Sequence, residues 1–278
     1  MYDEAILKNT IGIFIKLKFY IDKKLLNKFM HLKFIASPTT GLNHIDIKFC
    51  EEKNIKIISL KNEIKFLRNI TPTAELTWAL ILNTYRKLNF SIDSVEKKYW
   101  DRDNFIGNDL KDKTIGILGY GRLGKIIHSY AKAFKMNVLI NDIKYNIKKK
   151  KEFVEIETLF ENSDIVTVHV NYSLKNNNFI SEKYLSKMKK KSLFVNTSRG
   201  EIVNEKDLLT HLQVDSHYVA LDVLANENNL KKNLLLKNIN KYKNLIITPH
   251  IGGNTYESVA KTENFIYEKI LKEFIFSG

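Results

Sequence analysis

From about residue 110 onward, short apolar runs rich in isoleucine and valine alternate with amphipathic stretches. Most of the runs are continuously apolar, which indicates strands buried on both faces of a parallel sheet. Between the first two runs, Leu123, Ile126, Ile127, Tyr130 and Phe134 recur at helical spacing. Strand, helix and strand in series predict a doubly wound α/β domain. The predicted strands cover 114–119, 137–142, 164–170, 192–198, 218–224 and 245–250.

The part of the chain before residue 110 repeats this rhythm more weakly. The stretches 10–15, 32–37 and 53–60 indicate strands, 21–30 indicates a helix, and 73–88 indicates a long amphipathic helix. Thr71 or Thr73 is expected to cap that helix, with Pro72 in its first turn. A last helix is expected over 255–275. We place a domain boundary at the end of the long helix, so that residues 1–88 with 258–278 form one domain and residues 89–257 form the other.

Length and composition are those of a globular protein of about two domains. The chain has 278 residues, of which 44% are apolar, and a single cysteine, Cys50. One cysteine allows no internal disulfide, so a reducing compartment is expected. The first residues show no signal-peptide pattern, and no apolar run approaches the roughly 18 residues of a membrane helix. We therefore expect a cytoplasmic protein without a membrane partner.

The net charge of +14 has two interpretations. A basic face could bind nucleic acid, or the lysines could reflect an AT-rich genome, since asparagine and isoleucine are abundant too. The lysines are scattered, and their densest run, 144–153, falls in a predicted loop. Only five residues are arginine, the side chain that nucleic-acid readers favour for base contacts. We favour the second interpretation and expect no nucleic-acid partner.

Three glycines follow the strand at 114–119 with the spacing GxGxxG. In GILGYGRLGK, Gly119 allows a tight turn, Gly121 lets the backbone approach a pyrophosphate, and Gly124 lets the helix lie close to its strand. The phosphates would lie over the helix N-terminus, where free N–H groups favour negative charge. Asp142, at the end of the next strand, would accept hydrogen bonds from the adenosine ribose and repel a 2′-phosphate. NAD rather than NADP is therefore expected, and helix–strand packing without a ligand is the alternative.

Further polar residues fall at the ends of predicted strands. Arg199 follows 192–198, Asp222 lies late in 218–224, and His250 ends 245–250. The carboxyl ends of parallel strands share one edge of the sheet, where open α/β sheets bind ligands. We therefore expect these side chains to line one crevice with the glycine turn. The planar guanidinium of Arg199 suits a substrate carboxylate, although an ion pair within a loop is the alternative.

Several segments together resemble the D-isomer-specific 2-hydroxyacid dehydrogenase family. The matching segments are GILGYGRLGKIIHSYAKAFKMNVLINDI, VNTSRGEIVNEKDL, ALDVLANE and ITPHIGG, preceded by TTGLNHIDIKFCEEKNIKI and TPTAELTWALIL. They occur in the family's order and spacing and cover nearly the whole chain. The resemblance implies two Rossmann-like domains with doubly wound parallel sheets, an active site in the cleft between them, NAD as the cofactor, and a homodimer.

The resemblance also implies roles for individual residues. Arg199 would bind the substrate carboxylate, His250 would be the catalytic acid/base, and Glu227 would be its carboxylate partner, although Glu201 or Glu205 could be confused with Glu227. A protonated imidazole would supply the proton that reduction of a 2-oxo acid requires, and the nearby carboxylate would favour the charged imidazolium.

The remaining roles concern the cofactor and the substrate. Asp222 would meet the nicotinamide carboxamide, and Arg122 with Leu123 would reach the pyrophosphate. Backbone N–H groups at Gly41 and Leu42 would bind the substrate carboxylate, whereas His44 is either a substrate contact or a loop histidine. No metal ion is expected. The other cofactor-binding residues implied are Gly119, Gly121, Gly124, Asp142, His169, Thr197 and Gly252.

Two departures from the family pattern stand out. Asn226 and Asn228 replace usual prolines in the loop that carries Glu227, so that loop is expected to be less rigid. The first matched strand, 10–15, corresponds to a segment that family members reach only well after their start, so the N-terminal domain is expected to be shortened.

We expect an NAD-dependent oxidoreductase that interconverts a small D-2-hydroxy acid and its 2-oxo acid, of the phosphoglycerate, glycerate/hydroxypyruvate or lactate type. The alternative is a nucleotide-binding regulatory protein that keeps the fold without turnover.

Overall fold

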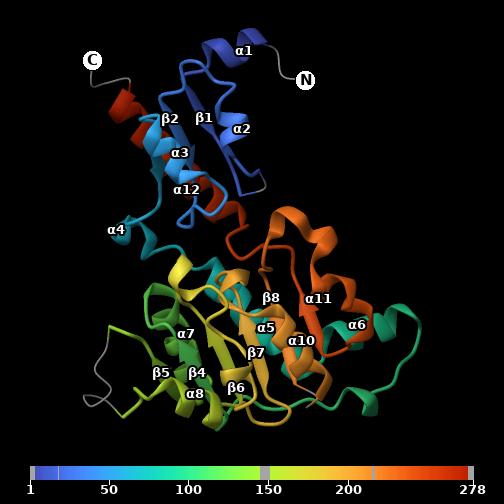
Figure 1. Ribbon diagram of the computed structural model, residues 1–278. Coiled ribbons are helices and arrows are strands. Elements are labelled where there is room, and N and C mark those ends of the chain that lie inside the picture. Colours follow the sequence, from blue (N-terminus) through green and yellow to red (C-terminus); the bar gives the residue numbers. More distant parts are fainter. Residues whose placement is uncertain (1–3, 18, 145–150, 215–216, 275–278) are drawn as a thin grey trace. The chain divides into compact units, whose positions relative to one another are not determined.

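The computed structural model describes residues 4–17, 19–144, 151–214 and 217–274 (Figure 1). The chain divides into two compact units, Met1–Ile70 with Asn254–Gly278, and Thr71–Gly253. These limits differ from the boundary expected at residue 88, because helix α5 (Pro72–Arg86) packs on α7, β7 and β8 of the second unit. The centre of the basic run at 144–153 lies outside the described residues.

The second unit contains a six-stranded sheet in which all neighbouring strands are parallel. The order is β5-β4-β6-β7-β8-β9, so each predicted strand is present. The observed strands end one to three residues earlier than predicted, and the residue that follows each strand is glycine or polar. The strands are β4 (Thr114–Leu118), β5 (Asn137–Asn141), β6 (Ile165–Val168), β7 (Leu193–Asn196), β8 (Tyr218–Leu221) and β9 (Leu245–Ile247).

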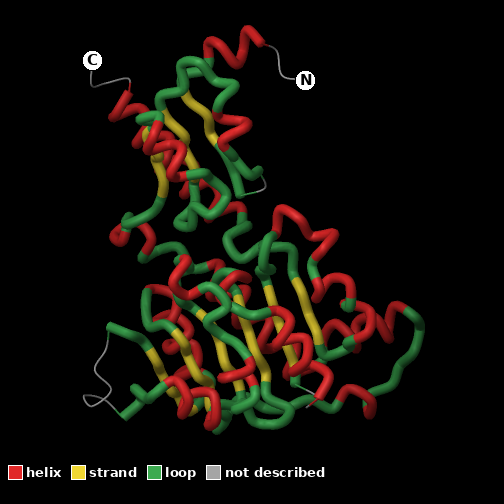
Figure 2. The backbone as a smooth tube through the Cα atoms, viewed as in Figure 1, coloured by secondary structure: helices red, strands yellow, loops and turns green. Residues whose placement is uncertain are grey.

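Helices cover both faces of this sheet, as the doubly wound prediction requires (Figure 2). On one face, α5 and α7 (Arg122–Ala133) enclose a core that includes Ile117, Ile127 and Val195. On the other face, the core around Phe160, Phe194 and Leu208 is covered by α8 (Ile156–Asn162), α9 (Glu182–Leu185), α10 (Glu205–Val214) and α11 (Leu234–Lys237). The other elements in the described part of this unit are α6 (Leu88–Glu96) and the 3-10 helices η1 (Asp103–Phe105), η3 (Leu174–Asn176), η4 (Gly200–Ile202), η5 (Glu227–Lys232) and η6 (Ile239–Lys241).

The first unit is also a parallel sheet between helices. Its strands β1 (Gly12–Phe14), β2 (Phe34–Ser37) and β3 (Lys56–Ser59) lie in that order. Helices α2 (Lys23–Leu26) and α3 (Ile47–Glu52) belong to the core around Ile35, and α12 (Tyr256–Phe274) packs on β2 and β3. The helix expected over 21–30 is shorter, because Asp22 caps its start and Asn27 ends it. Two short helices, α1 (Glu4–Asn9) and α4 (Ile64–Leu67), complete the unit. None of the helices in the described ranges could span a membrane.

Candidate functional site

The sheet of the second unit has a switch point between β4 and β6. The chain leaves β4 to form β5 on one side and returns to form β6 on the other, and such a point opens a crevice beyond the carboxyl ends of the two strands. Gly119 follows β4 with φ +94°, a conformation that favours glycine. A Cβ at this position would lie 2.7 Å from the carbonyl carbon of His169, which follows β6. The glycine therefore allows the two strand ends to approach at the crevice.

The other two glycines shape the start of α7. A Cβ on Gly124 would overlap the carbonyl oxygen of Gly119, so this glycine permits close packing of helix on strand. A Cβ on Gly121, by contrast, would meet no atom within 4 Å. Gly121 is the N-cap of α7, so this open space lies at the helix N-terminus. The first N–H groups of a helix have no partner within the helix and can bind a pyrophosphate there. Arg122 begins the helix, and burial lowers its pKa. Leu123 packs against the core.

Asp142 follows β5 and binds the glycine turn. Its Oδ2 accepts a hydrogen bond of 2.7 Å from the backbone N–H of Tyr120, and Oδ1 accepts one of 2.8 Å from that of Lys144. The carboxylate therefore lies beside the loop that the sequence assigns to the cofactor, at the position predicted for a ribose partner.

His169 is a buried histidine at the switch point. Its Nε2 lies 2.9 Å from the Thr167 hydroxyl, and Nδ1 has no hydrogen-bond partner among the described residues. Burial lowers its pKa from 6.5 to about 3, so the ring is neutral at physiological pH. A buried polar atom without a partner is costly unless a ligand satisfies it. The unpartnered Nδ1 of His169 and the open space at Gly121 together show that the residues present fit a dinucleotide.

A buried asparagine shapes the turn that carries Arg199. Asn196, the last residue of β7, accepts hydrogen bonds from the N–H (3.0 Å) and hydroxyl (2.7 Å) of Ser198 and donates one of 2.9 Å to the carbonyl of Arg199. The guanidinium in turn donates to the Ser198 carbonyl at 2.7 Å. Thr197, which lies between Asn196 and Ser198 in the sequence, is buried, and its hydroxyl lies 2.7 Å from the hydroxyl of Thr77 on α5. The turn is therefore fixed from several sides.

His250 and Glu227 form a direct pair. His250 Nδ1 lies 2.7 Å from Glu227 Oε2, and Glu227 Oε1 accepts a hydrogen bond of 3.1 Å from Leu224 N–H. Burial raises the pKa of Glu227, but the bonds to His250 and Leu224 and the charge of Arg199 outweigh it, and the net direction is down. The pKa of Arg199 is lowered by burial, against the charge of Glu227. Guanidinium, carboxylate and imidazole therefore belong to one electrostatic group.

Asp222 holds the turn that presents His250. Oδ1 accepts hydrogen bonds from the Thr248 hydroxyl (2.6 Å) and Ile251 N–H (2.8 Å), and Oδ2 accepts one of 2.7 Å from Gly252 N–H. Burial raises the pKa of Asp222, and these bonds oppose the rise. His250 has φ +53°, a left-handed conformation that is uncommon outside glycine. The buried carboxylate stabilises this strained backbone.

The segment predicted to bind the substrate carboxylate belongs to the first unit. The Thr39 hydroxyl donates a hydrogen bond of 2.9 Å to the carbonyl of Gly41, which precedes Leu42. Ser37 Oγ lies 2.9 Å from that hydroxyl and 3.1 Å from His44 Nε2. His44 is buried, so it is part of the network beneath this loop rather than an exposed loop histidine.

The sequence motifs did not single out several residues that shape the site. Asn196 and Thr248 carry no distinctive spacing, and only their place at the end of a strand could have indicated them. Their roles depend on hydrogen bonds to the Arg199 turn and to Asp222, which no linear pattern reveals.

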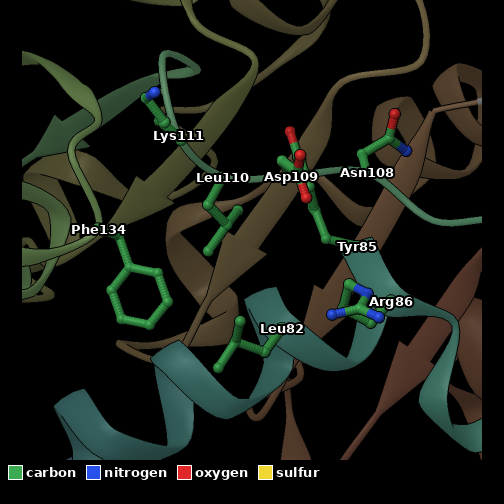
Figure 3. Close-up of a pocket in the computed structure, with 8 residues that line it drawn as sticks. All are labelled: Leu82, Tyr85, Arg86, Asn108, Asp109, Leu110, Lys111 and Phe134. Carbon is green, nitrogen blue, oxygen red and sulfur yellow. The ribbon is translucent and has the colours of Figure 1, made fainter.

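A pocket of about 360 Å³ lies away from these residues (Figure 3). Its walls come from the C-terminal end of α5, the segment before β4 and the end of α7. These segments lie at the amino-terminal edge of the sheet, opposite the carboxyl edge that carries the predicted site. The lining residues are Leu82, Tyr85, Arg86, Asn108, Asp109, Leu110, Lys111 and Phe134. None of the predicted site residues belongs to it.

Comparison with known proteins extends these observations. Residues 78–252 match the sequence model of the family described as "D-isomer specific 2-hydroxyacid dehydrogenase, NAD binding domain". The chain is 30% identical over 248 residues to the hydroxypyruvate reductase of Thermotoga maritima, covering 87% of this chain and 78% of that protein.

Two solved structures are similar over almost the whole chain. The D-lactate dehydrogenase of Aquifex aeolicus, complexed with NAD and lactic acid, is 28% identical with a TM-score of 0.80, and the alignment covers 99% of this chain and 86% of that one. The phosphoglycerate oxidoreductase of Vibrio cholerae is 26% identical with a TM-score of 0.85, and the alignment covers 99% and 89% of the two chains.

Proposed function

Because the chain belongs to the D-isomer specific 2-hydroxyacid dehydrogenase family, we propose that it interconverts a small D-2-hydroxy acid and its 2-oxo acid, with His250 as acid/base. One observation carries the proposal. His250, Glu227 and Arg199 form one electrostatic group at the carboxyl edge of the sheet that also carries the glycine turn. The reaction needs a proton donor and a carboxylate-binding cation near a dinucleotide site, and this edge offers all three.

His250 donates or accepts the substrate proton in the proposed reaction. The ionised carboxylate of Glu227 can only accept a hydrogen bond, so His250 Nδ1 carries a hydrogen. The other ring nitrogen, Nε2, is then the atom that exchanges a proton with the substrate. In reduction, protonated Nε2 donates its proton to the carbonyl oxygen of the 2-oxo acid as the alkoxide develops. In oxidation, neutral Nε2 accepts the hydroxyl proton. Glu227 stabilises the imidazolium in both directions.

Arg199 binds the substrate carboxylate in this proposal. Its guanidinium offers two parallel hydrogen bonds that orient a planar carboxylate. Desolvation of the guanidinium, seen in its lowered pKa, strengthens attraction to an anion. We also propose that the backbone N–H groups at Gly41 and Leu42 of the first unit contact the substrate.

NAD supplies or takes the hydride when it is bound. We propose that Gly119, Gly121, Arg122, Leu123 and Gly124 hold its pyrophosphate. Asp142 takes the adenosine ribose. His169, Thr197, Asp222 and Gly252 lie beside the nicotinamide half. The unsatisfied Nδ1 of His169 and the open space at Gly121 support this assignment.

The substrate class follows from the same group. One guanidinium matches one carboxylate, and the relatives act on hydroxypyruvate, lactate or phosphoglycerate, according to their names. We propose a short 2-oxo acid with a single carboxylate next to the carbonyl.

The test measures loss of NADH absorbance with pyruvate, hydroxypyruvate, glyoxylate and 3-phosphohydroxypyruvate. At least one acid should drive NADH oxidation, and His250→Ala should abolish it, whereas His31→Ala, on an exposed histidine of the first unit, should not. Tight NADH binding without turnover on any acid would instead support a regulatory nucleotide-binding protein.

We also propose a homodimer. On α6, Leu88, Ile92 and Val95 recur at helical spacing and are 44%, 58% and 52% exposed, and Trp100 beyond the helix is 90% exposed. An exposed apolar stripe of this kind marks a protein interface. Light scattering coupled to size-exclusion chromatography should give twice the chain mass, and Ile92→Lys should shift it toward the monomer. A monomer at micromolar concentration would contradict the proposal.

A further inference from the structure

The loop that carries Glu227 contains one short 3-10 helix, η5, which is irregular. It runs from Asp222 to Asn233 without a proline, and Asn226 adopts φ +54°. The 3-10 helix η5 within the loop begins at Glu227 and is interrupted at Asn229, where φ is −135° and ψ is 54°. Within the loop, the Glu227 side chain is bound only through Leu224 N–H at 3.1 Å, as far as the described residues show. The position of the carboxylate therefore depends on what holds the loop from outside.

A single side chain outside the loop binds it both before and after Glu227 in the sequence. Glu205, the first residue of α10, accepts a hydrogen bond of 2.7 Å from Ala225 N–H through Oε1 and one of 2.6 Å from Asn233 Nδ2 through Oε2. Ala225 precedes Glu227 by two residues, and Asn233 follows it by six. The carboxylate thus bridges the loop across the segment that carries Glu227.

Asn233 makes the second attachment firm. The side chain is buried, its Oδ1 accepts a hydrogen bond of 3.0 Å from Leu236 N–H, and it thereby caps α11. Its Nδ2 also lies 3.4 Å from the carbonyl of Ala225. Helices α10 and α11 pack against each other, so the attachment connects two packed helices (Figure 1).

The loop also contacts the turn of Arg199. A Cβ on Gly200 would overlap the backbone of Leu224 and Ala225, so the two segments are in direct backbone contact. Gly200 and Glu205 therefore both contact the backbone of Ala225. Both come from the short segment that follows β7, which also carries Arg199.

The ionised form of Glu205 is disfavoured by its surroundings, apart from these hydrogen bonds. Burial raises the pKa of Glu205, the bonds from Ala225 and Asn233 oppose the rise, and the charges of Glu201 and Glu227 add to it. A half-buried carboxylate beside two others is destabilising unless its hydrogen bonds compensate. The two attachments to the loop are those hydrogen bonds.

We propose that Glu205 is a positioning residue of the active site, which fixes the loop through Ala225 and Asn233 and so keeps Glu227 on Nδ1 of His250. The inference rests on the proposed function for its kinetic consequences. Glu205 touches neither substrate nor cofactor in this account. Asn233 is its partner and shares the role.

The test exchanges donor and acceptor between the two side chains. Glu205→Gln leaves an amide facing the Asn233 amide, and Asn233→Asp leaves a carboxylate facing the Glu205 carboxylate. Each single variant therefore loses one attachment. In the double variant E205Q/N233D, the new amide can donate to the new carboxylate, and the N–H of Ala225 and of Leu236 keep their acceptors. Glu161→Gln, on the exposed surface of α8, is the matched control.

The value of kcat should depend on whether the hydrogen bond between residues 205 and 233 is present. Each single variant should lower kcat by about 10-fold to 100-fold with little change in the KM for NADH, because a small displacement of a reacting group costs that much. The pH profile of kcat should take the shape measured for Glu227→Gln, and the double variant should recover most of the loss. Unchanged kcat and an unchanged pH profile in both single variants would overturn the inference, while activity of the wild type would leave the proposed function intact.

A proton NMR signal gives a readout without turnover. A hydrogen on Nδ1 shared with a carboxylate resonates far downfield, and its loss in Glu227→Gln assigns it. We expect the signal to weaken or disappear in Glu205→Gln and to return in the double variant. Its persistence in the single variants would overturn the inference even if no substrate is found.

Discussion

His250 Nδ1 lies 2.7 Å from Oε2 of Glu227, a carboxylate whose net pKa shift is downward despite its burial. In the proposed reaction, the pair keeps a hydrogen on Nδ1 and leaves the other ring nitrogen, Nε2, for proton transfer. The charge of Arg199 acts on the same carboxylate, so the proposed binding of an anionic substrate and the proposed proton transfer would involve coupled charges.

Replacement of His250 should abolish proton transfer without loss of the fold. Its backbone is left-handed, and asparagine tolerates that conformation better than alanine does, so His250→Asn is the safer variant. We expect kcat to fall by about 10² to 10⁴-fold. NADH affinity, measured by fluorescence titration, should stay near that of the wild type. A variant within a few-fold of wild-type kcat would exclude His250 as the acid/base.

Asp142 should determine the preference for NADH over NADPH. Its carboxylate would face a 2′-phosphate, and it also accepts the Tyr120 N–H at 2.7 Å. Asp142→Ser removes the charge and keeps a hydrogen-bond acceptor. We expect the ratio of kcat/KM for NADH to that for NADPH to fall at least about tenfold, equivalent to about 1.4 kcal/mol. An unchanged ratio would mean that another group discriminates between the cofactors.

Asp222 should stabilise the second unit as well as the site. Asp222→Asn places an amide against at least one of the three donors that the carboxylate now accepts from. We expect a loss of about 1–3 kcal/mol in the free energy of unfolding, the usual cost of an unsatisfied buried group. Urea denaturation followed by circular dichroism measures it. Asp93→Asn, on the exposed face of α6, should change stability little, and an equal effect of the two substitutions would refute the role.

His169 should make the folded state sensitive to acid. Above pH 6.5 the ring is neutral in both the folded and the unfolded chain. As the pH falls from 6.5 toward about 3, only the unfolded chain takes up the proton, so stability is progressively lost. His169→Asn should therefore lose less stability than the wild type between pH 7 and pH 5.

Urea titrations at those two pH values test the prediction, with His31→Asn, on an exposed side chain, as the control. The difference in unfolding free energy between the wild type and His169→Asn should change by up to about 1.4 kcal/mol per pH unit below 6.5. A pH-independent difference would show that the ring titrates normally in the folded protein.

The sequence predicted the sheet of the second unit well because its strands are apolar on both faces and are bounded by amphipathic helices. It also placed Gly119, Asp142, Arg199 and His250 at one edge, since parallel strands share their polarity. The limit of the first unit was harder to predict. Helix α5 follows the first unit in sequence, but its buried face packs on β7 and β8, which only the tertiary structure reveals.

In the candidate site, too, local sequence patterns indicated some residues, whereas contacts between residues far apart in the sequence could not be predicted. Glu227 lies in a polar loop where no periodicity distinguishes it from Glu201 or Glu205, and its partner His250 is 23 residues away. Asp222 was expected to face the cofactor, and its hydrogen bonds to Thr248, Ile251 and Gly252 reveal an additional structural role. Contacts of this kind depend on how loops from separate strands meet.

The most direct test of the account is the mass and configuration of the product formed from a 2-oxo acid and NADH deuterated at the transferring carbon. Hydride transfer followed by protonation from His250 predicts a D-2-hydroxy acid with one deuterium on C2 and an ordinary hydrogen on its oxygen. An L-product, or a D-product whose C2 hydrogen came from the solvent, would contradict it.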